Sequence, residues 1–322
     1  MRWIDKRGAA AMAAALALAA CATIPAATPD REILIAGSGI YPESMDADRA
    51  GNIYVGSSGG TIYRASAGAD RALPFITPDA RNGLQSLYGI LVDEPRGMLW
   101  ACSNPPFGAP PATTPQPPAI AAFALDDGSL QGRWPFPAGE RPVTCNDMAI
   151  DAGGTLFTTD IASGRIYALA RGGTALTLFA DDPALVGADG IAFAGDGTMY
   201  INNVRQHLVQ RVNRGADGAY AGLTTLTLSQ PVNGPDALRP VGGNRFLQAE
   251  GGSGRIALVE IEGDRATVTT VTDQFDSVAS VARVGSVGYS AEGKIAYLFD
   301  PALAGQDPGA FTIESFPLPP GL

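Results

Sequence analysis

The stretch TCNDMAIDAGGTLFTTD, residues 144–160, has the pattern of a β-hairpin. The polar pair Asn146-Asp147 precedes a short apolar run, Gly153-Gly154 marks a turn, and a second run of apolar and β-branched residues follows. Two short runs joined by a glycine turn favour antiparallel strands over a helix. Taken alone, the Asn146-Asp147 pair fits ordinary turn chemistry.

The same pattern recurs along the chain and decides the fold. Each copy has a small or polar leader, an apolar strand, a glycine-bearing turn and a second apolar strand. The copies are ESMDADRAGNIYVG from Glu43, GILVDEPRGMLWAC from Gly89, NDMAIDAGGTLFTT from Asn146, DGIAFAGDGTMYIN from Asp189 and DALRPVGGNRFLQA from Asp236. Their spacing of roughly 40 to 50 residues, stretched once by an insertion, is typical of propeller blades.

A weaker sixth copy runs from SVASVARVGSVGYSAEG through KIAYLFD, and its leader is Ala279 or Gly285. Pieces such as GTIYRA and GRIYALA supply outer strands, and REILIAG, residues 31–37, can close the ring by pairing into the last blade. We therefore predict an all-β fold, a six-bladed β-propeller with four-stranded blades around a central metal-binding channel. Residues 31–322 form this single domain.

Composition narrows the possible partners. The 322 residues carry a net charge of −10 with a pI near 4.6, and 46% are hydrophobic. Because nucleic-acid binding needs clustered Lys and Arg, this acidic chain is expected to bind no nucleic acid. We expect a monomer that acts on a small molecule.

The N-terminus is typical of a bacterial export signal. Basic residues precede a short Ala/Leu run that ends at Cys21. This run is too short to span a membrane. Residues 1–21 resemble a lipoprotein signal with Cys21 as the lipid acceptor, and residues 22–30 a tether; a plain cleaved signal or a longer signal anchor are the alternatives. The sequence predicts an exported protein, periplasmic or anchored to the outer membrane, with membrane contact only through the lipid.

Only Cys102 and Cys145 remain beyond Cys21. Two cysteines are too few for a disulfide scaffold or a cysteine zinc site. A single bridge between them is one interpretation, but we expect a pair of free thiols.

The leaders point to a shared metal site. In a propeller the first strand of each blade lines the channel, so Glu43, Asn146, Asp189 and Asp236 should converge. Carboxylate and amide oxygens suit hard cations, and we expect Ca²⁺, with Mg²⁺, Mn²⁺ or Zn²⁺ as alternatives. Crowded carboxylates without a cation would raise one another's pKa values. Asp48, Asp151 and Asp196, just before the hairpin glycines, are predicted to be turn acceptors.

These leaders also resemble those of a known family. PES at Pro42, CNDMAIDAGGTLF, ADGIAFAGDGTMYINN and GPDAL from Gly234 are similar to blades of the regucalcin/gluconolactonase family, which includes luciferin-regenerating enzyme and is distantly similar to paraoxonase. The resemblance implies that Glu43, Asp189 and Asp236 bind metal directly and that Asn146 is a ligand or a substrate contact. Asp189 stands where the family usually has Asn, and Thr144 where sugar lactonases often have Arg.

The resemblance implies a metal-dependent hydrolase of lactones or related esters. The cation would polarise the carbonyl, and Asp236 and Asp147 are the candidate catalytic residues. The structural alternative for Asp147 is a hydrogen bond to a neighbouring blade. A non-catalytic binding platform with a structural cation and a phosphotriester hydrolase are the alternative functions.

Loops after the second strands should return to the face of the leaders and select the substrate. This predicts substrate-binding roles for Asn203, His207 and Glu250, to which the family resemblance adds Asn146. For His207, the one histidine in the sequence, an exposed turn position is the competing interpretation.

Overall fold

The computed structural model describes residues 31–106 and 116–322. The predicted export signal 1–21 and the tether 22–30 lie outside the described residues, so the structure does not test them. No helix among the described residues is long and apolar enough to cross a membrane.

The regular secondary structure of the described chain is mostly antiparallel β-sheet, as the hairpin repeat predicts. The innermost strands are β2 (Pro42–Ala47), β6 (Ser86–Asp93), β10 (Cys145–Ile150), β14 (Ala188–Phe193), β19 (Pro235–Gly242) and β23 (Ala282–Val284). Their hairpin partners are β3 (Ile53–Ser57), β7 (Met98–Asn104), β11 (Leu156–Asp160), β15 (Met199–Asn203), β20 (Arg245–Glu250) and β24 (Val287–Ala291).

Two further strands complete each sheet toward the rim. The third strands are β4 (Ile62–Ala65), β8 (Ala119–Ala124), β12 (Arg165–Leu169), β16 (Leu208–Arg214), β21 (Arg255–Glu262) and β25 (Thr312–Pro317). The outer strands are β5 (Arg71–Ile76), β9 (Leu130–Pro135), β13 (Thr177–Asp181), β17 (Tyr220–Thr225), β22 (Arg265–Thr272) and β1 (Glu32–Ile35). The short β18 (Thr227–Leu228) pairs with β22 at the rim. Short helices are η1 (Glu94–Arg96), η2 (Pro183–Leu185) and α1 (Ala296–Phe299).

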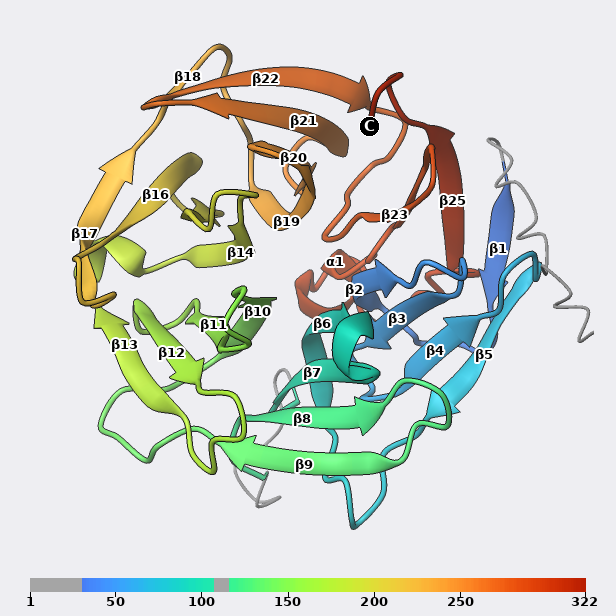
Figure 1. Ribbon diagram of the computed structural model, residues 1–322. Helices are drawn as coiled ribbons and strands as arrows, with labels where there is room; N and C mark the ends of the chain where they lie inside the picture. The colour runs from blue at the N-terminus through green and yellow to red at the C-terminus, as the bar shows by residue number, and fades with distance from the viewer. Residues whose placement is uncertain (1–30, 107–115) are drawn as a thin grey trace, which may run out of the picture.

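The sheets stand around a central axis like the blades of a propeller (Figure 1). Strands β6–β9, β10–β13 and β14–β17 form four-stranded sheets, and β18–β22 form a five-stranded one. Neighbouring first strands contact one another in the order β23, β2, β6, β10, β14 and β19. Apolar clusters fill the space between sheets; in one of them Ile166 and Ala180 pack against Ile191 and Met199.

The first and last parts of the chain share one eight-stranded sheet, in the order β2-β3-β4-β5-β1-β25-β24-β23. REILIAG supplies β1, which pairs antiparallel with β25 through Ile33 and Ile313. The predicted pairing of this segment into the last sheet is therefore confirmed. Strand β1 also pairs in parallel with β5, so it joins strands β23, β24 and β25 to strands β2–β5.

The sixth copy differs from its prediction in two places. KIAYLFD contains the helical turn α1 instead of a strand, and the third strand of this sheet is Thr312–Pro317. Gly285 lies in the β23–β24 turn with a φ of 58°, so it is no leader. Ala279 lies next to the innermost strand β19, because its carbonyl accepts a hydrogen bond from Ala237 N.

A disulfide joins Cys102 on β7 to Cys145 on β10, with 5.4 Å between the Cα atoms. The expectation of free thiols is wrong. The hairpins of neighbouring sheets bring the two residues together across 43 positions of sequence. The bridge therefore links two sheets immediately before Asn146.

Candidate active site

A β-bulge places each leader. The pairing register slips between Pro42 and Ser44, Leu87 and Ile90, Cys145 and Met148, Ala188 and Ile191, and Pro235 and Leu238. A bulge adds a residue to one strand and redirects its side chain, which is why bulges are frequent beside functional sites. The first bulge residues are Glu43, Tyr88, Asn146, Asp189 and Asp236.

The first bulge side chains lie close enough to act on one another. Asn146 Nδ2 donates a hydrogen bond to Asp189 Oδ1, and the carboxyl groups of Asp189 and Asp236 share another. The charge of Glu43 raises the pKa of both aspartates. Of the four residues predicted from the sequence as metal ligands, Asn146, Asp189 and Asp236 are thus linked by hydrogen bonds, and Glu43 lies near enough to act on the two aspartates through its charge.

Burial and like charge shift the acids of this cluster in one direction. Burial raises the pKa of Glu43 to about 7. Burial first, then the charge of Asp147, raises the pKa of Asp189, and burial followed by the charges of Asp189 and Glu43 raises that of Asp236. The cluster therefore gains from any positive charge placed within it.

The donor set suits a hard divalent cation, since it offers carboxylate and amide oxygens without sulfur or imidazole. Within residues 31–106 and 116–322, no group of three or more His, Cys, Asp and Glu side chains is arranged to hold a metal ion. The metal role of Glu43, Asn146, Asp189 and Asp236 stays a prediction.

Tyr88 is a site residue that the sequence interpretation missed. The repeat alignment put Gly89 at the leader position, but the bulge in β6 puts Tyr88 there and Gly89 at the second position. Burial and the nearby charge of Glu43 raise the pKa of the Tyr88 phenol. A tyrosine directly before the aligned glycine was the available signal.

The second bulge residue joins one sheet to the next. Ser44 Oγ accepts a hydrogen bond from Ile90 N at 3.0 Å, and Ser280 Oγ accepts one from Met45 N at 2.8 Å. Where this residue is glycine, the next leader packs closely: a Cβ at Gly89 would lie 2.1 Å from Asn146 O.

Asp147 occupies this second position. Its Oδ2 accepts a hydrogen bond from Ile191 N at 3.2 Å, as Ser44 and Ser280 do for their neighbours. Both of its oxygens also accept hydrogen bonds from the guanidinium of Arg239, at 2.7 and 3.1 Å. These contacts match the structural alternative for Asp147, and a catalytic role would have to disrupt them.

Polar side chains of the second strands form hydrogen bonds with the backbone at and beside the leaders. Thr159 Oγ1 accepts a hydrogen bond from Asp147 N and donates one to Asp189 O. Asn202 accepts from Gly190 N and donates to Asp236 O at 2.6 Å. The leader backbones are therefore held across sheet boundaries before any ligand binds.

Asn203 and Glu250 are engaged by their own loops. The Asn203 amide accepts from the backbone of Arg205 and Gln206 and donates to Val186 O. Glu250 is fully buried, and its two oxygens accept from Asn233 N and the Arg255 guanidinium, among others. Because these contacts use both ends of each side chain, we do not carry the two residues into the proposed site.

His207 lies exposed in the turn between β15 and β16, with a φ of 56°. Its Nδ1 accepts a hydrogen bond from Gly234 N at 2.8 Å, two residues before Asp236. The His207 ring thus helps to fix the loop that precedes Asp236. The expected turn acceptors Asp48, Asp151 and Asp196 accept hydrogen bonds from Asn52 N, Thr155 N and Thr198 N.

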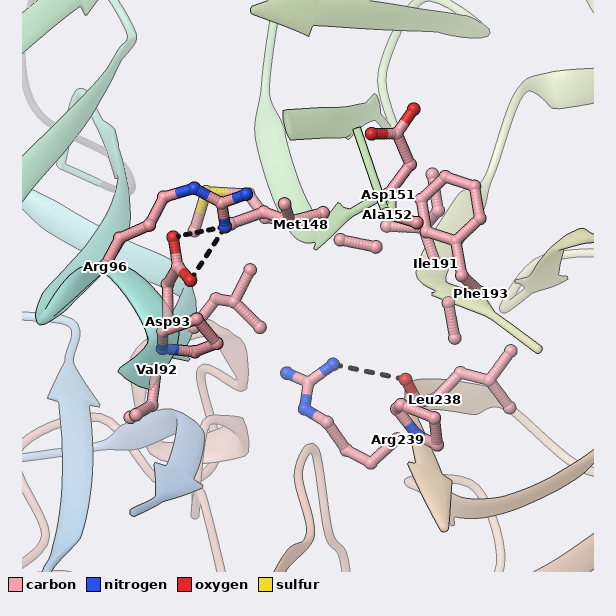
Figure 2. A pocket seen from close by; sticks show the side chains of 16 residues that line it. Val92, Asp93, Arg96, Met148, Asp151, Ala152, Ile191, Phe193, Leu238 and Arg239 are labelled. Carbon is pink, nitrogen blue, oxygen red and sulfur yellow. Dashed lines mark hydrogen bonds and ion pairs between the residues drawn. The ribbon is translucent and has the colours of Figure 1, made fainter. Parts of the chain in front are cut away.

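A cavity of about 430 Å³ lies at the far ends of the first strands. Figure 2 shows apolar side chains such as Met148, Ile191 and Phe193 around it, with Arg96 bound to Asp93 at its edge. Arg239 is also at its wall, three residues after Asp236 on β19. The Arg239–Asp147 ion pair therefore lies between this cavity and the leaders.

Comparisons with known proteins agree with this fold. The Strictosidine synthase-like, N-terminal family model matches residues 30–65. No curated protein matches the chain. Solved structures of a protein described as a gluconolactonase (15% identity, TM-score 0.61, 90% of this chain and 94% of that one) and of luciferin-regenerating enzyme (16%, 0.61, 88% and 95%) are similar.

A catalytically inactive variant of virginiamycin B lyase from Staphylococcus aureus is also similar, with 13% identity, a TM-score of 0.56 and coverage of 89% of this chain and 98% of that one. At these identities the likeness shows the fold. The predicted resemblance to gluconolactonase and luciferin-regenerating enzyme is confirmed at that level.

Proposed function

We propose that the protein is a divalent-cation-dependent hydrolase of lactones or related esters. The observation that carries this proposal is the convergence of Glu43, Asn146, Asp189 and Asp236, delivered by equivalent bulges of four sheets. We also propose that the eight-stranded sheet counts as two blades, which gives six blades around a metal-binding channel.

Three mutually repelling acids with raised pKa values support a cation at this position, because positive charge would offset both their burial and their repulsion. Ca²⁺ is our first choice for an all-oxygen donor set, ahead of Mg²⁺, Mn²⁺ and Zn²⁺. When bound, such a cation would polarise the carbonyl oxygen of the substrate and stabilise the charge that develops on it.

The chain's own residues would position the reactants. The pKa of Asp236 is raised well above that of an ordinary aspartate, which makes its carboxylate a stronger base, so we assign it the role of accepting a proton from the attacking water. The Tyr88 phenol is protonated at neutral pH, and its raised pKa keeps it so well into the alkaline range, so it can donate a hydrogen bond to a substrate oxygen. Asp147 positions β10 against β14 and β19.

The test is a panel of lactones, aryl esters and phosphotriesters, assayed with chelator and with each cation added back. We expect lactone or ester turnover that chelator removes and Ca²⁺ restores. Asp236→Asn should lower kcat by about 100-fold or more. Asp196→Asn, at an exposed turn aspartate, is the matched control and should retain activity.

Other outcomes select the alternatives. Unchanged turnover in folded Asp236→Asn protein would refute the catalytic assignment. Chelator-sensitive melting without turnover across the panel would indicate a binding platform, and cleavage of phosphotriesters alone a phosphotriester hydrolase.

We propose export as well, with residues 1–21 as the signal and Cys21 as the lipid acceptor. The Cys102–Cys145 disulfide supports an oxidising compartment. Cys21→Ser should move the protein from the membrane fraction to the soluble fraction of a bacterial host, while a protein that stays with the membrane would contradict the anchor.

A further inference from the structure

The segment between β24 and β25, residues 292–311, carries an unusual apolar surface. Six large hydrophobic side chains are exposed among the described residues. Leu73, Leu130 and Leu178 lie singly on three different outer strands. Ile295, Leu298 and Phe299 instead fall within five residues at α1, with exposed fractions of 37%, 38% and 53%. Clustered apolar exposure points to binding more than scattered exposure does.

This segment lies at the end of the channel where the leaders converge. A Cβ at Gly293 would be 3.0 Å from the carbonyl oxygen of Pro42, the residue before Glu43. Ala291, at the end of β24, lines one small gap together with Glu43. Figure 1 accordingly draws α1 near the centre of the ring, beside β2.

The segment is held in place by Lys294. Its Nζ donates hydrogen bonds to the carbonyls of Pro308 and Ala310, at 3.0 and 2.8 Å, and lies 5.3 Å from the centre of the Phe311 ring. Phe311 is fully buried and packs edge-on against Tyr41. Because the base of the segment is anchored, α1 is held at a fixed place that follows the contact of Gly293 with Pro42.

We propose that Ile295, Leu298 and Phe299 form an apolar wall of the active-site mouth that binds the hydrocarbon part of the substrate. This rests on the proposed function and deepens it. A substrate that reaches Asp236 and the wall together has a polar, hydrolysable group and an acyl chain or aryl ring. The substrate class is therefore a lipophilic ester or lactone, and a polyhydroxylated sugar lactone would leave the wall unused.

Chain length is the variable that tests the wall. For p-nitrophenyl esters from acetate to octanoate, each added methylene should raise kcat/KM about twofold. Full burial of a methylene group would raise it roughly fourfold, and we expect each methylene to be about half buried. The double variant Leu298→Ser/Phe299→Ser should lose this gain with chain length. Leu178→Ser, at a leucine 54% exposed on β13, is the matched control and should keep the gain.

A second readout separates failure of the wall from failure of the hydrolase. N-octyl dansylamide carries no ester, and its fluorescence reports binding without turnover. Binding that is weakened about tenfold or more in the double variant, but not in Leu178→Ser, would support the wall even if no ester is cleaved. Equal melting temperatures of the three proteins would verify that they fold alike.

The wall is refuted if the double variant keeps both the chain-length gain and the dansylamide affinity. It is also refuted if the double variant loses only sedimentation with phosphatidylethanolamine/phosphatidylglycerol vesicles, or only self-association in analytical ultracentrifugation. Those results would assign α1 to a membrane surface or to a second copy of the chain.

Discussion

Asp147 shows how one register position can separate two roles that a sequence leaves open. The residue follows a leader, which made it a candidate base, yet it occupies the same bulge position as Ser44 and Ser280. All three accept a backbone N–H from the neighbouring sheet. Asp147 makes this contact with a charged side chain, and Arg239 supplies the opposite charge.

Removing either member of the Asp147–Arg239 pair should destabilise the fold. Both side chains are more than nine-tenths buried, so Arg239→Met or Asp147→Asn leaves its partner without full compensation. We expect a loss of about 3–5 kcal/mol for Arg239→Met in urea unfolding, and somewhat less for Asp147→Asn. The double variant should recover at least half of the loss, because Arg239 Nε already lacks a hydrogen-bond partner among the described residues.

The same variants distinguish a structural role of Asp147 from a role as catalytic base. A stable Asp147→Asn protein that has lost turnover would make Asp147 catalytic after all. A protein that is destabilised but still turns over at temperatures where it stays folded would confirm the structural role.

The acid cluster predicts an unusual pH dependence in chelator. The folded-state pKa of Glu43, about 7, lies above its ordinary value of 4.5, and those of Asp189 and Asp236 are raised too. Between these values the folded state binds more protons than the unfolded one, so stability is fully present below pH 4.5 and falls as pH rises through 7. Glu43 alone accounts for about 3 kcal/mol at most.

Thermal melts at pH 5 and pH 8, with EDTA or with Ca²⁺, measure this effect. We expect a lower melting temperature at pH 8 in EDTA and a rise on adding Ca²⁺ at pH 8. Asp236→Asn should flatten the dependence. A chelated protein that is more stable at pH 8 than at pH 5 would show that the acids are not crowded as described.

At the scale of elements, the disulfide between β7 and β10 should contribute strongly to stability. It closes a loop of 43 residues, for which the chain-entropy estimate is about 4 kcal/mol. Cys102→Ser/Cys145→Ser should lower the free energy of unfolding by an amount approaching this. The parent with reductant should melt like the variant, and an oxidised parent that matches the variant would mean that the bridge is not formed.

How far the sequence predicts these elements depends on whether a feature is local. Gly153-Gly154 and the alternating runs beside it specify their hairpin without help from the rest of the chain. Tyr88 was missed because a bulge shifts the register by one, and the tyrosine before Gly89 was the one local sign of that shift. KIAYLFD was read as a strand because a short apolar run is ambiguous, and only the pairing of Thr312–Pro317 with β24 excludes it.

At the scale of the whole molecule, closure of the ring depends on the N-terminal strand. Strand β1 pairs with β25 on one side and with β5 on the other, so it joins the two ends of the chain. The Arg31 backbone adds hydrogen bonds to Ser315 in both directions. A propeller whose ends part would expose two long sheet edges, and such edges favour aggregation.

Ile33 is the residue through which this closure can be measured. Its side chain is 1% exposed and packs with Phe311 and Ile313, so Ile33→Ala should cost about 3 kcal/mol. Glu32→Ala, exposed on the same strand, is the control and should be near neutral.

Trp100 and Trp134 belong to the sheet β6–β9, away from β1, so their fluorescence reports whether the loss spreads around the ring. If closure holds the ring together, tryptophan fluorescence and far-ultraviolet circular dichroism will shift to the same lower urea midpoint in Ile33→Ala. A fluorescence midpoint that stays at the parent value while the dichroism midpoint falls would mean that the sheets unfold separately, and that β1 stabilises only the sheet it enters.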